Sequence, residues 1–313
     1  MKAYVTRRIP QDDLERISAH ADLASWEGDE PVPRDVLLEA IADLDGLLCM
    51  LTDRIDAELI SAATDLRVVS QMAVGVDNID LEACRERGIR VGHTPDVLTE
   101  AVADHAIGLL LAAARRIPEG LREVSEGRWG AWDPWHQLGV DVHGTTLGIV
   151  GMGRLGNAVA RRARGFGMTV IYASRRETGE IGERLPLDDL LSMADHVVLT
   201  VPLTSETERM IDGAALGQMK ESAVLVNISR GPVVDHAALE GALRSGSIFA
   251  AALDVTDPEP LPSHSTLLDL DNCLVVPHIA SATRNTREAM ARLATDNLLA
   301  GLDGREMPAE MGL

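Results

Sequence analysis

The stretch Thr145–Gly156, TTLGIVGMGRLG, decides how the rest of the chain folds. Its apolar run at 147–150 is typical of a short buried parallel strand, and the residues after the last glycine continue with helical periodicity. Between that strand and that helix, Gly151, Gly153 and Gly156 form the spacing G-x-G-x-x-G. We therefore predict a strand, a tight turn and a helix in direct succession.

Each glycine has a separate task in such a turn. The first permits the tight turn off the strand, the second lets the backbone approach a pyrophosphate, and the third lets helix and strand pack closely. The free N–H groups at the helix N-terminus then face the anion. An ordinary glycine-rich turn is the alternative, because the chain has 27 glycines. The position of the motif between a strand and a helix favours dinucleotide binding.

Composition restricts the class of protein. With 313 residues, the chain is long enough for two domains, each with its own core. A net charge of −20 argues against nucleic acid or an anionic membrane surface as a partner, and no apolar run reaches the length of a membrane span. Cys49, Cys84 and Cys273 lie far apart, without the spacing of metal ligands. We therefore expect no metal site, and reduced, mostly buried thiols in a cytosolic protein.

Short apolar strands alternate with amphipathic helices along the chain, which indicates parallel sheets covered by helices on both faces. Residues 1–98 lack a glycine motif, and we assign them, with 285–313, to a substrate domain. Residues 99–284 carry the motif and six predicted strands, as expected of a dinucleotide-binding domain. The predicted fold class is α/β, with two doubly wound parallel-sheet domains. One is a Rossmann dinucleotide-binding domain and the other is flavodoxin-like.

Two segments after residue 98 have unusual composition. Residues 99–114 are apolar almost all round, so we predict a helix that is buried on every side. The loop that follows carries three of the four tryptophans, Trp129, Trp132 and Trp135. Packing against their own domain is one interpretation. We favour an arm that packs on a second copy of the chain, which predicts a homodimer.

Three polar residues follow apolar strands in the second half, where open α/β sheets place their ligands. Arg230 follows VLVNIS, Glu259 lies in DVTDPEP, and His278 follows CLVVP. Arginine binds a carboxylate with two parallel hydrogen bonds, histidine moves a proton near neutral pH, and a carboxylate orients and charges that histidine. Reduction of a 2-keto acid needs these three groups. Taken singly, each could be an ordinary surface residue, and Asp254 and Glu259 could belong to an acidic loop.

Four segments, VGMGRLG, NISRGPVVD, AALDVTDPEPLP and VVPHIASAT, resemble those of the D-2-hydroxyacid dehydrogenases. The resemblance extends over the whole chain. VTRRIP, GLLCMLTD, AVGVDNID, RGIRVGHTPDVLTE and DNLLAGLDGREMP are most similar to the glyoxylate reductase/hydroxypyruvate reductase branch.

The resemblance implies roles for individual residues in binding the substrate and in catalysis. Arg230 would anchor the substrate carboxylate, and His278 would be the general acid/base. Glu259 would keep this histidine protonated for reduction. The backbone N–H groups of Val74 and Gly75 would also meet the substrate carboxylate.

The resemblance also implies contacts with the cofactor and with a partner. Asp254 would hold the nicotinamide carboxamide, and the glycine loop, with Arg154 and Leu155 between its glycines, would hold the pyrophosphate. A tryptophan of the loop after the apolar helix would reach a neighbouring active site. Trp132 and Trp135 are both candidates, and we favour Trp135.

One departure from the family pattern concerns the end of the strand in TVIYASRRE. NAD-binding members have an acidic residue about 20 residues past the glycines, whereas Ser174, Arg175 and Arg176 stand there in this chain. Arginine side chains suit the 2′-phosphate of NADPH, and solvated surface charge is the alternative. We therefore predict that NADPH is the preferred cofactor and leave the use of NADH open.

The combined prediction is an NADPH-preferring reductase of small 2-keto acids, glyoxylate and hydroxypyruvate first, that forms D-2-hydroxy acids. Another D-2-hydroxyacid dehydrogenase or a phosphite dehydrogenase of the same fold is an alternative. A dinucleotide-sensing binding protein similar to a corepressor is the alternative from another class.

Overall fold

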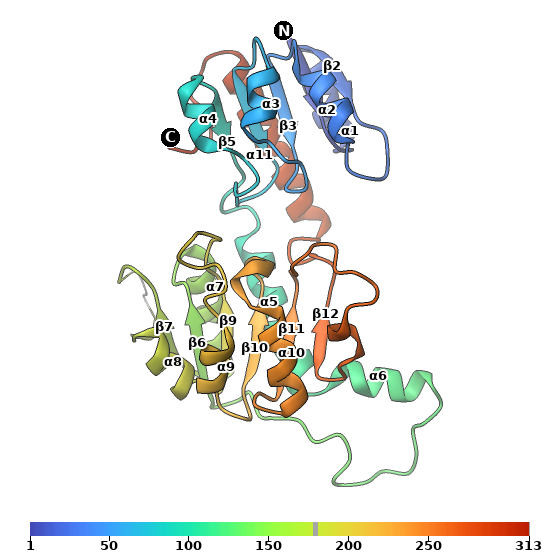
Figure 1. The fold of residues 1–313 in the computed structure, drawn as a ribbon, viewed down its shortest axis with the longest axis vertical. Helices are drawn as coiled ribbons and strands as arrows, with labels where there is room; N and C mark the ends of the chain where they lie inside the picture. Colours follow the sequence, from blue (N-terminus) through green and yellow to red (C-terminus); the bar gives the residue numbers. More distant parts are fainter. Residues whose placement is uncertain (178–180, 313) are drawn as a thin grey trace. The chain divides into compact units, whose positions relative to one another are not determined.

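The computed structural model describes residues 1–177 and 181–312 and divides the chain into two compact units (Figure 1). Unit 1 contains Met1–Leu98 and Thr283–Leu313, and unit 2 contains Thr99–Ala282. The sequence placed the second boundary after residue 284. Thr283 belongs to unit 1 because it is the N-cap of α11 (Arg284–Leu302), which packs on the sheet of that unit.

Among the described residues, unit 1 is built around a five-stranded parallel sheet with strand order β2-β1-β3-β4-β5. Its strands are β1 (Lys2–Val5), β2 (Asp22–Ser25), β3 (Gly46–Cys49), β4 (Val68–Gln71) and β5 (Arg90–Gly92). This order confirms the flavodoxin-like prediction. The sequence did not indicate β2, because this short edge strand is half polar and only partly buried.

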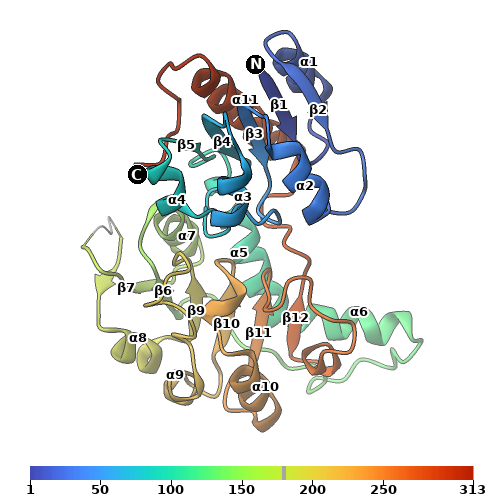
Figure 2. The ribbon, with the colours of Figure 1, turned by 45° about the horizontal axis from the view of Figure 1, so that its top comes forward.

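Helices cover both faces of this sheet, because successive strand residues point to opposite sides. One face carries α2 (Arg34–Ile41), α3 (Ala57–Ala62) and α4 (Leu81–Glu86), and the other carries α1 (Gln11–Ser18) and α11 (Figure 2). Leu47 of β3 packs into the first core, and the next residue, Leu48, packs into the second. The unit is therefore doubly wound, as predicted.

Among the described residues, unit 2 has a seven-stranded parallel sheet with order β12-β11-β10-β9-β6-β7-β8. Its strands are β6 (Thr146–Val150), β7 (Thr169–Ala173), β8 (Glu183–Arg184), β9 (His196–Leu199), β10 (Val224–Asn227), β11 (Ala250–Leu253) and β12 (Cys273–Val275). Started at β8, the order is the Rossmann 3-2-1-4-5-6 with a seventh strand added. The six-strand prediction missed β8, because two residues are too few to show periodicity.

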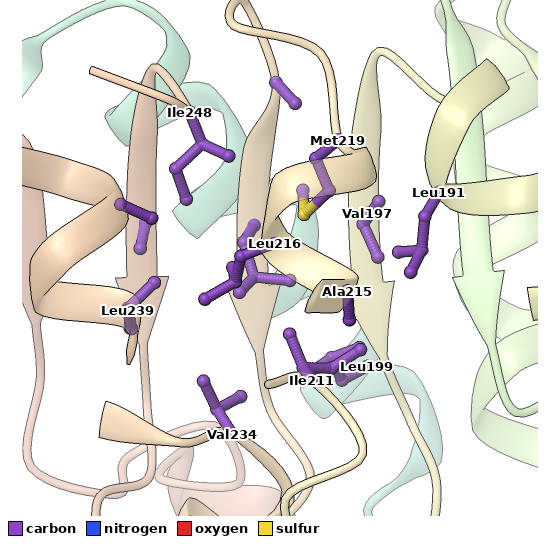
Figure 3. Packing of buried hydrophobic residues seen from close by; sticks show 14 of the residues in the cluster. Leu191, Val197, Leu199, Ile211, Ala215, Leu216, Met219, Val234, Leu239 and Ile248 are labelled. Atoms are coloured by element: carbon purple, nitrogen blue, oxygen red, sulfur yellow. The ribbon is translucent and has the colours of Figure 1, made fainter. Parts of the chain in front are cut away.

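Helices also cover both faces of the second sheet. One face carries α8 (Leu187–Met193), α9 (Gly213–Gln218) and α10 (His236–Ser245), and the other carries α5 (Thr99–Ala114) and α7 (Arg154–Gly165). Figure 3 shows the core under α9, where Ala215 and Leu216 pack with Val197 and Leu199 of β9. This apolar layer holds the strand ends of the sheet in fixed positions.

The helix α5 has the predicted bounds, but the prediction that it is buried on every side is wrong. Glu100, Asp104 and Gly108 are exposed and recur every four residues, so they form one stripe along the helix. Arg162 of α7 lies against this stripe, with Nε 2.6 Å from Asp104 and Nη1 2.9 Å from Glu100. The helix packs on one face of a sheet and on α7, which leaves one side to water.

The three tryptophan side chains of the loop after α6 (Ile117–Ser125) are not packed against their own unit. In this tryptophan loop, residues 126–145, all of them described, form neither helix nor strand (Figure 1). Trp129, Trp132 and Trp135 are 74%, 86% and 78% exposed within the chain. The interpretation that these rings pack against their own domain is therefore wrong.

Two expectations from composition concern thiols and membranes. Cys49 and Cys84 are buried free thiols, and Cys273 is a half-buried free thiol. Burial raises the pKa of Cys84 to about 11 and that of Cys273 to about 12, so both are protonated near neutral pH. Within the described part of the chain, no helix is long and apolar enough to cross a membrane.

The packing of α11 on β4 predicts opposite effects for one substitution in two helices. A Cβ at Gly301 would lie 2.5 Å from Cγ2 of Val68, whereas a Cβ at Gly241 in α10 would meet open space. We expect Gly301→Ala to lower the free energy of unfolding by about 1–3 kcal/mol through overpacking. Gly241→Ala should raise it by about 0.5–1 kcal/mol, because alanine favours a helix. Denaturant unfolding measures both, and equal effects would contradict the packing.

Candidate active site

The glycine motif forms the turn between β6 and α7. Gly151 has a φ of +102°, and a Cβ there would lie 2.9 Å from the carbonyl group of Thr200. A Cβ at Gly156 would overlap the carbonyl oxygen of Gly151, whereas a Cβ at Gly153 would meet open space. The first glycine therefore makes the turn, the third lets the helix approach the strand, and the second leaves one side of the turn open.

The N-terminus of α7 suits an anion. The helix begins at Arg154, and its N-cap, Gly153, has no side chain that could accept hydrogen bonds from the first N–H groups. These N–H groups and the positive end of the helix dipole attract negative charge. Because the turn is open at Gly153, its backbone can be approached closely. These residues fit the pyrophosphate of a dinucleotide.

Candidate residues follow three neighbouring strands of unit 2. Arg230 follows β10, Asp254 follows β11, and His278 follows β12. Because all pairs are parallel, these strand ends lie along the same edge of the sheet as the glycine turn after β6. A Cβ at Gly231 would overlap the carbonyl oxygen of Thr256, so only glycine lets these two loops meet. The structure thereby holds the arginine against the loop that follows β11.

Glu259 and His278 form a direct pair, as the sequence indicated. Oε1 of Glu259 lies 2.6 Å from Nδ1 of His278, and the two side chains are 35% and 24% exposed. The other carboxylate oxygen accepts a hydrogen bond from the N–H of Thr256 at 3.4 Å. With Nδ1 engaged, Nε2 is the ring nitrogen that can exchange a proton with a ligand.

Asp254 holds the backbone that carries His278. His278 has a φ of +51°, a left-handed conformation that is uncommon outside glycine. Oδ1 of Asp254 accepts a hydrogen bond from the N–H of Ile279 at 2.7 Å, and Oδ2 accepts one from Ala280 at 3.0 Å. The N–H of His278 donates to the carbonyl oxygen of Asp254 at 2.9 Å. The aspartate therefore stabilises the strained turn through three hydrogen bonds.

His105 of α5 is a polar neighbour that sequence reasoning missed. Its Nε2 lies 3.3 Å from Oδ1 of Asp254, within ion-pair distance but without the alignment of a full hydrogen bond. Burial by itself would raise the pKa of Asp254, but His105 and the two backbone N–H groups lower it below its usual value. Asp254 is therefore an anion at neutral pH although it is 2% exposed. A single histidine in an apolar helical segment gave no signal of this contact.

The candidate site for the adenosine ribose lies at the end of β7. The hydroxyl of Ser174 donates a hydrogen bond to the carbonyl oxygen of Arg176 and closes a short turn. Nη1 of Arg175 lies 3.6 Å from Oε2 of Glu206, and both side chains are more than two-thirds exposed. Such an exposed pair is weak, so it does not prevent Arg175 from binding another anion. Arg184 of β8 contacts the same turn, and the sequence did not indicate it.

Val74 and Gly75 lie in unit 1, in the loop that follows β4. Nε2 of Gln71 donates to the carbonyl oxygen of Gly75 at 3.1 Å, and Nδ1 of His93 lies 3.0 Å from the carbonyl oxygen of Val74. Because C=O and the next N–H point in opposite directions across a trans peptide, the contact at Val74 turns the N–H of Gly75 away from His93. Trp135 lies on the exposed loop, where its backbone N–H donates to Oδ1 of Asp133 at 2.8 Å.

A Rossmann sheet with this glycine turn and a histidine–carboxylate pair at the same edge defines a class, the dinucleotide-dependent oxidoreductases. Residues 107–280, more than half of the chain, match the family described as D-isomer specific 2-hydroxyacid dehydrogenase, NAD binding domain. The chain belongs to the D-isomer specific 2-hydroxyacid dehydrogenases, and it is an NAD(P)-dependent oxidoreductase.

Relatives place the chain near one branch of that family. It is 50% identical to the glyoxylate reductase of Korarchaeum cryptofilum, over 98% of this chain and 94% of the relative. It is 44% identical to the human glyoxylate reductase/hydroxypyruvate reductase, over 100% of this chain and 98% of the relative. These relatives confirm the resemblance found in the sequence.

Solved structures agree with the family assignment. A crystal structure of the TT0316 protein from Thermus thermophilus has a TM-score of 0.95 and 48% identity, and the match covers 100% of both chains. An NADPH-dependent glyoxylate/hydroxypyruvate reductase from Sinorhizobium meliloti, solved with NADP and malonate, has a TM-score of 0.87 and 34% identity. That match covers 99% of this chain and 96% of the other.

The glycine turn predicts that binding and stability respond to different glycines. Gly153→Ala should leave the melting temperature nearly unchanged, because its Cβ meets open space. It should weaken dinucleotide binding about tenfold or more, because the methyl group stands where the backbone must approach the pyrophosphate. Gly156→Ala should instead destabilise the fold through its overlap with Gly151. Calorimetric titration and thermal unfolding separate the two, and undiminished binding by Gly153→Ala would contradict the assignment.

Proposed function

We propose that the protein is an NADPH-preferring reductase of small 2-keto acids, glyoxylate and hydroxypyruvate first, which forms D-2-hydroxy acids. The observation that carries the proposal is the 2.6 Å contact between Glu259 and Nδ1 of His278, which leaves Nε2 for a substrate. The names of the relatives, glyoxylate reductase and hydroxypyruvate reductase, support the substrate class. The relative solved with NADP supports the cofactor.

His278 is the proposed proton donor. A bound nicotinamide cofactor supplies the hydride for the carbonyl carbon. His278 holds the proton at Nε2 and gives it to the carbonyl oxygen, because Nδ1 faces Glu259. Glu259 orients the ring through its contact with Nδ1. The left-handed turn fixed by Asp254 sets the direction from which the ring reaches the substrate.

Arg230 is the proposed anchor for the substrate carboxylate. Its guanidinium can form two parallel hydrogen bonds with a carboxylate, which orients the substrate as well as binding it. One nitrogen, Nη1, donates to the carbonyl oxygen of Ser229 at 2.9 Å and limits the motion of the side chain. The N–H groups of Val74 and Gly75 in unit 1 stay a prediction from the family resemblance for binding a substrate carboxylate.

The catalytic pair predicts a loss of turnover when either side chain is replaced. Glu259→Gln weakens the contact that orients the ring through Nδ1, so we expect kcat for reduction to fall. His278→Ala should lower turnover by roughly 10²–10⁴, the usual contribution of a general acid. Steady-state kinetics measures both, and near-full turnover of His278→Ala with chemistry rate-limiting would refute the proton donor.

Cofactor preference follows from the chemistry at the end of β7. An acidic residue at position 174 would bind the ribose hydroxyls of NAD and repel a 2′-phosphate, whereas Ser174 removes that repulsion. Arg175 and Arg176 can pair with the phosphate dianion. A charge pair 4 Å apart near a surface has a Coulomb energy of about 4 kcal/mol. Exposure, salt and desolvation of the phosphate reduce the net gain to about 1–3 kcal/mol.

We therefore expect NADPH to be preferred over NADH roughly 5- to 150-fold in kcat/KM, at about 1.4 kcal/mol per tenfold. The preference should shrink with added salt, and Ser174→Asp combined with Arg175→Ala should reverse it. Steady-state kinetics with both cofactors and a panel of 2-keto acids, with phosphite in the oxidising direction, tests the cofactor and the substrate together. Equal or better use of NADH would refute the preference, and absence of turnover on the whole panel would refute the reductase.

We also propose that the exposed tryptophan loop packs on a second copy of the chain, and that Trp135 reaches the neighbouring active site. The loop follows α6, whose Leu121 and Val124 are also exposed, so apolar groups gather on this part of unit 2. Large exposed apolar patches of this kind mark interaction sites. A homodimer with a two-fold, self-complementary interface would cover it.

The dimer predicts a change of molar mass on removal of the aromatic rings. A variant with Trp129, Trp132 and Trp135 all replaced by Ser should be monomeric or much weaker as a dimer, because the interface loses its largest apolar groups. Met193→Ser removes an exposed apolar side chain elsewhere in unit 2 and should leave the dimer intact. Light scattering at micromolar concentration measures both, and a monomeric intact protein would refute the interface.

A further inference from the structure

Arg184 contacts the turn that the proposed function assigns to the cofactor. It lies on β8, whose two residues pair in parallel with β7, opposite Tyr172. Its Nε donates to the carbonyl oxygen of Ser174 at 2.9 Å, and its Nη2 donates to the carbonyl oxygen of Arg175 at 3.2 Å. One planar guanidinium therefore holds two successive carbonyl groups on the same side.

This contact also decides where the backbone N–H groups of the turn point. In a trans peptide, the N–H of the next residue points opposite to the carbonyl group. With the carbonyls of Ser174 and Arg175 directed at Arg184, the N–H groups of Arg175 and Arg176 point to the other side. The hydroxyl of Ser174 engages the third carbonyl, that of Arg176. The three oxygen atoms that would repel an anion are thus all engaged by donors.

We propose that Arg184 is a positioning residue for cofactor selection, because it orients the 174–176 turn so that two N–H groups and two arginine side chains face an adenosine 2′-phosphate. Successive N–H groups on one side of a turn form a concavity that binds anions. The inference rests on the proposed preference for NADPH and adds the group that prepares the site. Arg184 acts through the backbone of the turn and need not touch the phosphate itself.

The fork of the guanidinium distinguishes positioning from simple charge. Arg184→Lys keeps the positive charge, but a single ammonium group cannot reproduce two donors in a fixed plane. Arg184→Gln removes the charge as well. If the residue acted only by attracting the phosphate, the lysine variant would behave like the unchanged protein. If it positions the turn, both variants lose selectivity.

The test measures binding of 2′,5′-ADP and of 5′-ADP to the full chain by calorimetric titration, without catalysis. We expect the unchanged protein to bind 2′,5′-ADP more tightly than 5′-ADP. Arg184→Lys and Arg184→Gln should each lose about tenfold of that preference, as for the loss of one charge-assisted hydrogen bond. Their affinity for 5′-ADP and their melting temperatures should change little, because β8 is a short exposed edge strand.

Arg164→Gln is the matched control. It removes the same charge from an exposed arginine near the C-terminus of α7. This end of the helix leads to the N-terminal end of β7, whereas the 174–176 turn follows the C-terminal end of that strand. The control variant should keep the preference. A lysine variant that retains the full preference would overturn the positioning role, and so would an equal loss of affinity for both nucleotides. If the unchanged protein has no preference for 2′,5′-ADP, the NADPH assignment fails together with this inference, while keto-acid turnover still tests the reductase separately.

Discussion

Parallel pairing of the strands in unit 2 is the constraint on which the candidate site depends. Gly151, Ser174, Arg230, Asp254 and His278 follow five different strands, yet they reach one edge because parallel strands end together. The helices that connect parallel strands also begin at that edge, so the anion-binding end of α7 lies there too. The apolar core under α9 fixes the positions of the strands. Because the loops after the strands are short, the polar residues on them are held close to the strand ends.

Polar groups at this edge stabilise one another. The left-handed backbone of His278 is costly, and Asp254 offsets the cost by accepting two N–H groups beyond it. The contacts with His105 and these N–H groups keep the buried carboxylate charged in spite of its burial. The same principle operates at β8, where Arg184 engages two carbonyl oxygen atoms of a turn. The strained backbone at His278 and the buried charge of Asp254 are therefore each stabilised by specific hydrogen-bond donors and acceptors.

The groups proposed to bind anions are positive or carry N–H donors, although the protein as a whole is negatively charged. The chain carries a net charge of −20, yet the proposed anion-binding groups are arginines and backbone N–H groups. Arg162 elsewhere in unit 2 is paired with Glu100 and Asp104, so it contributes little net field. Binding of an anionic substrate or cofactor depends on the field at the site that receives it and not on the total charge.

The sequence by itself determined the class of fold, the glycine turn and the candidates Arg230, Glu259 and His278, because periodicity and motif spacing are local properties. Only the tertiary structure decided which atoms meet: Glu259 with Nδ1 of His278, and His105 and two N–H groups with Asp254. It also decided the exposed stripe of α5, the exposure of the tryptophan loop, and the strands β2 and β8, which are too short or too polar to show a pattern. Such contacts join residues that are distant in the chain, and they depend on strand order and on close approaches such as that of Gly231 to Thr256, which no local pattern encodes.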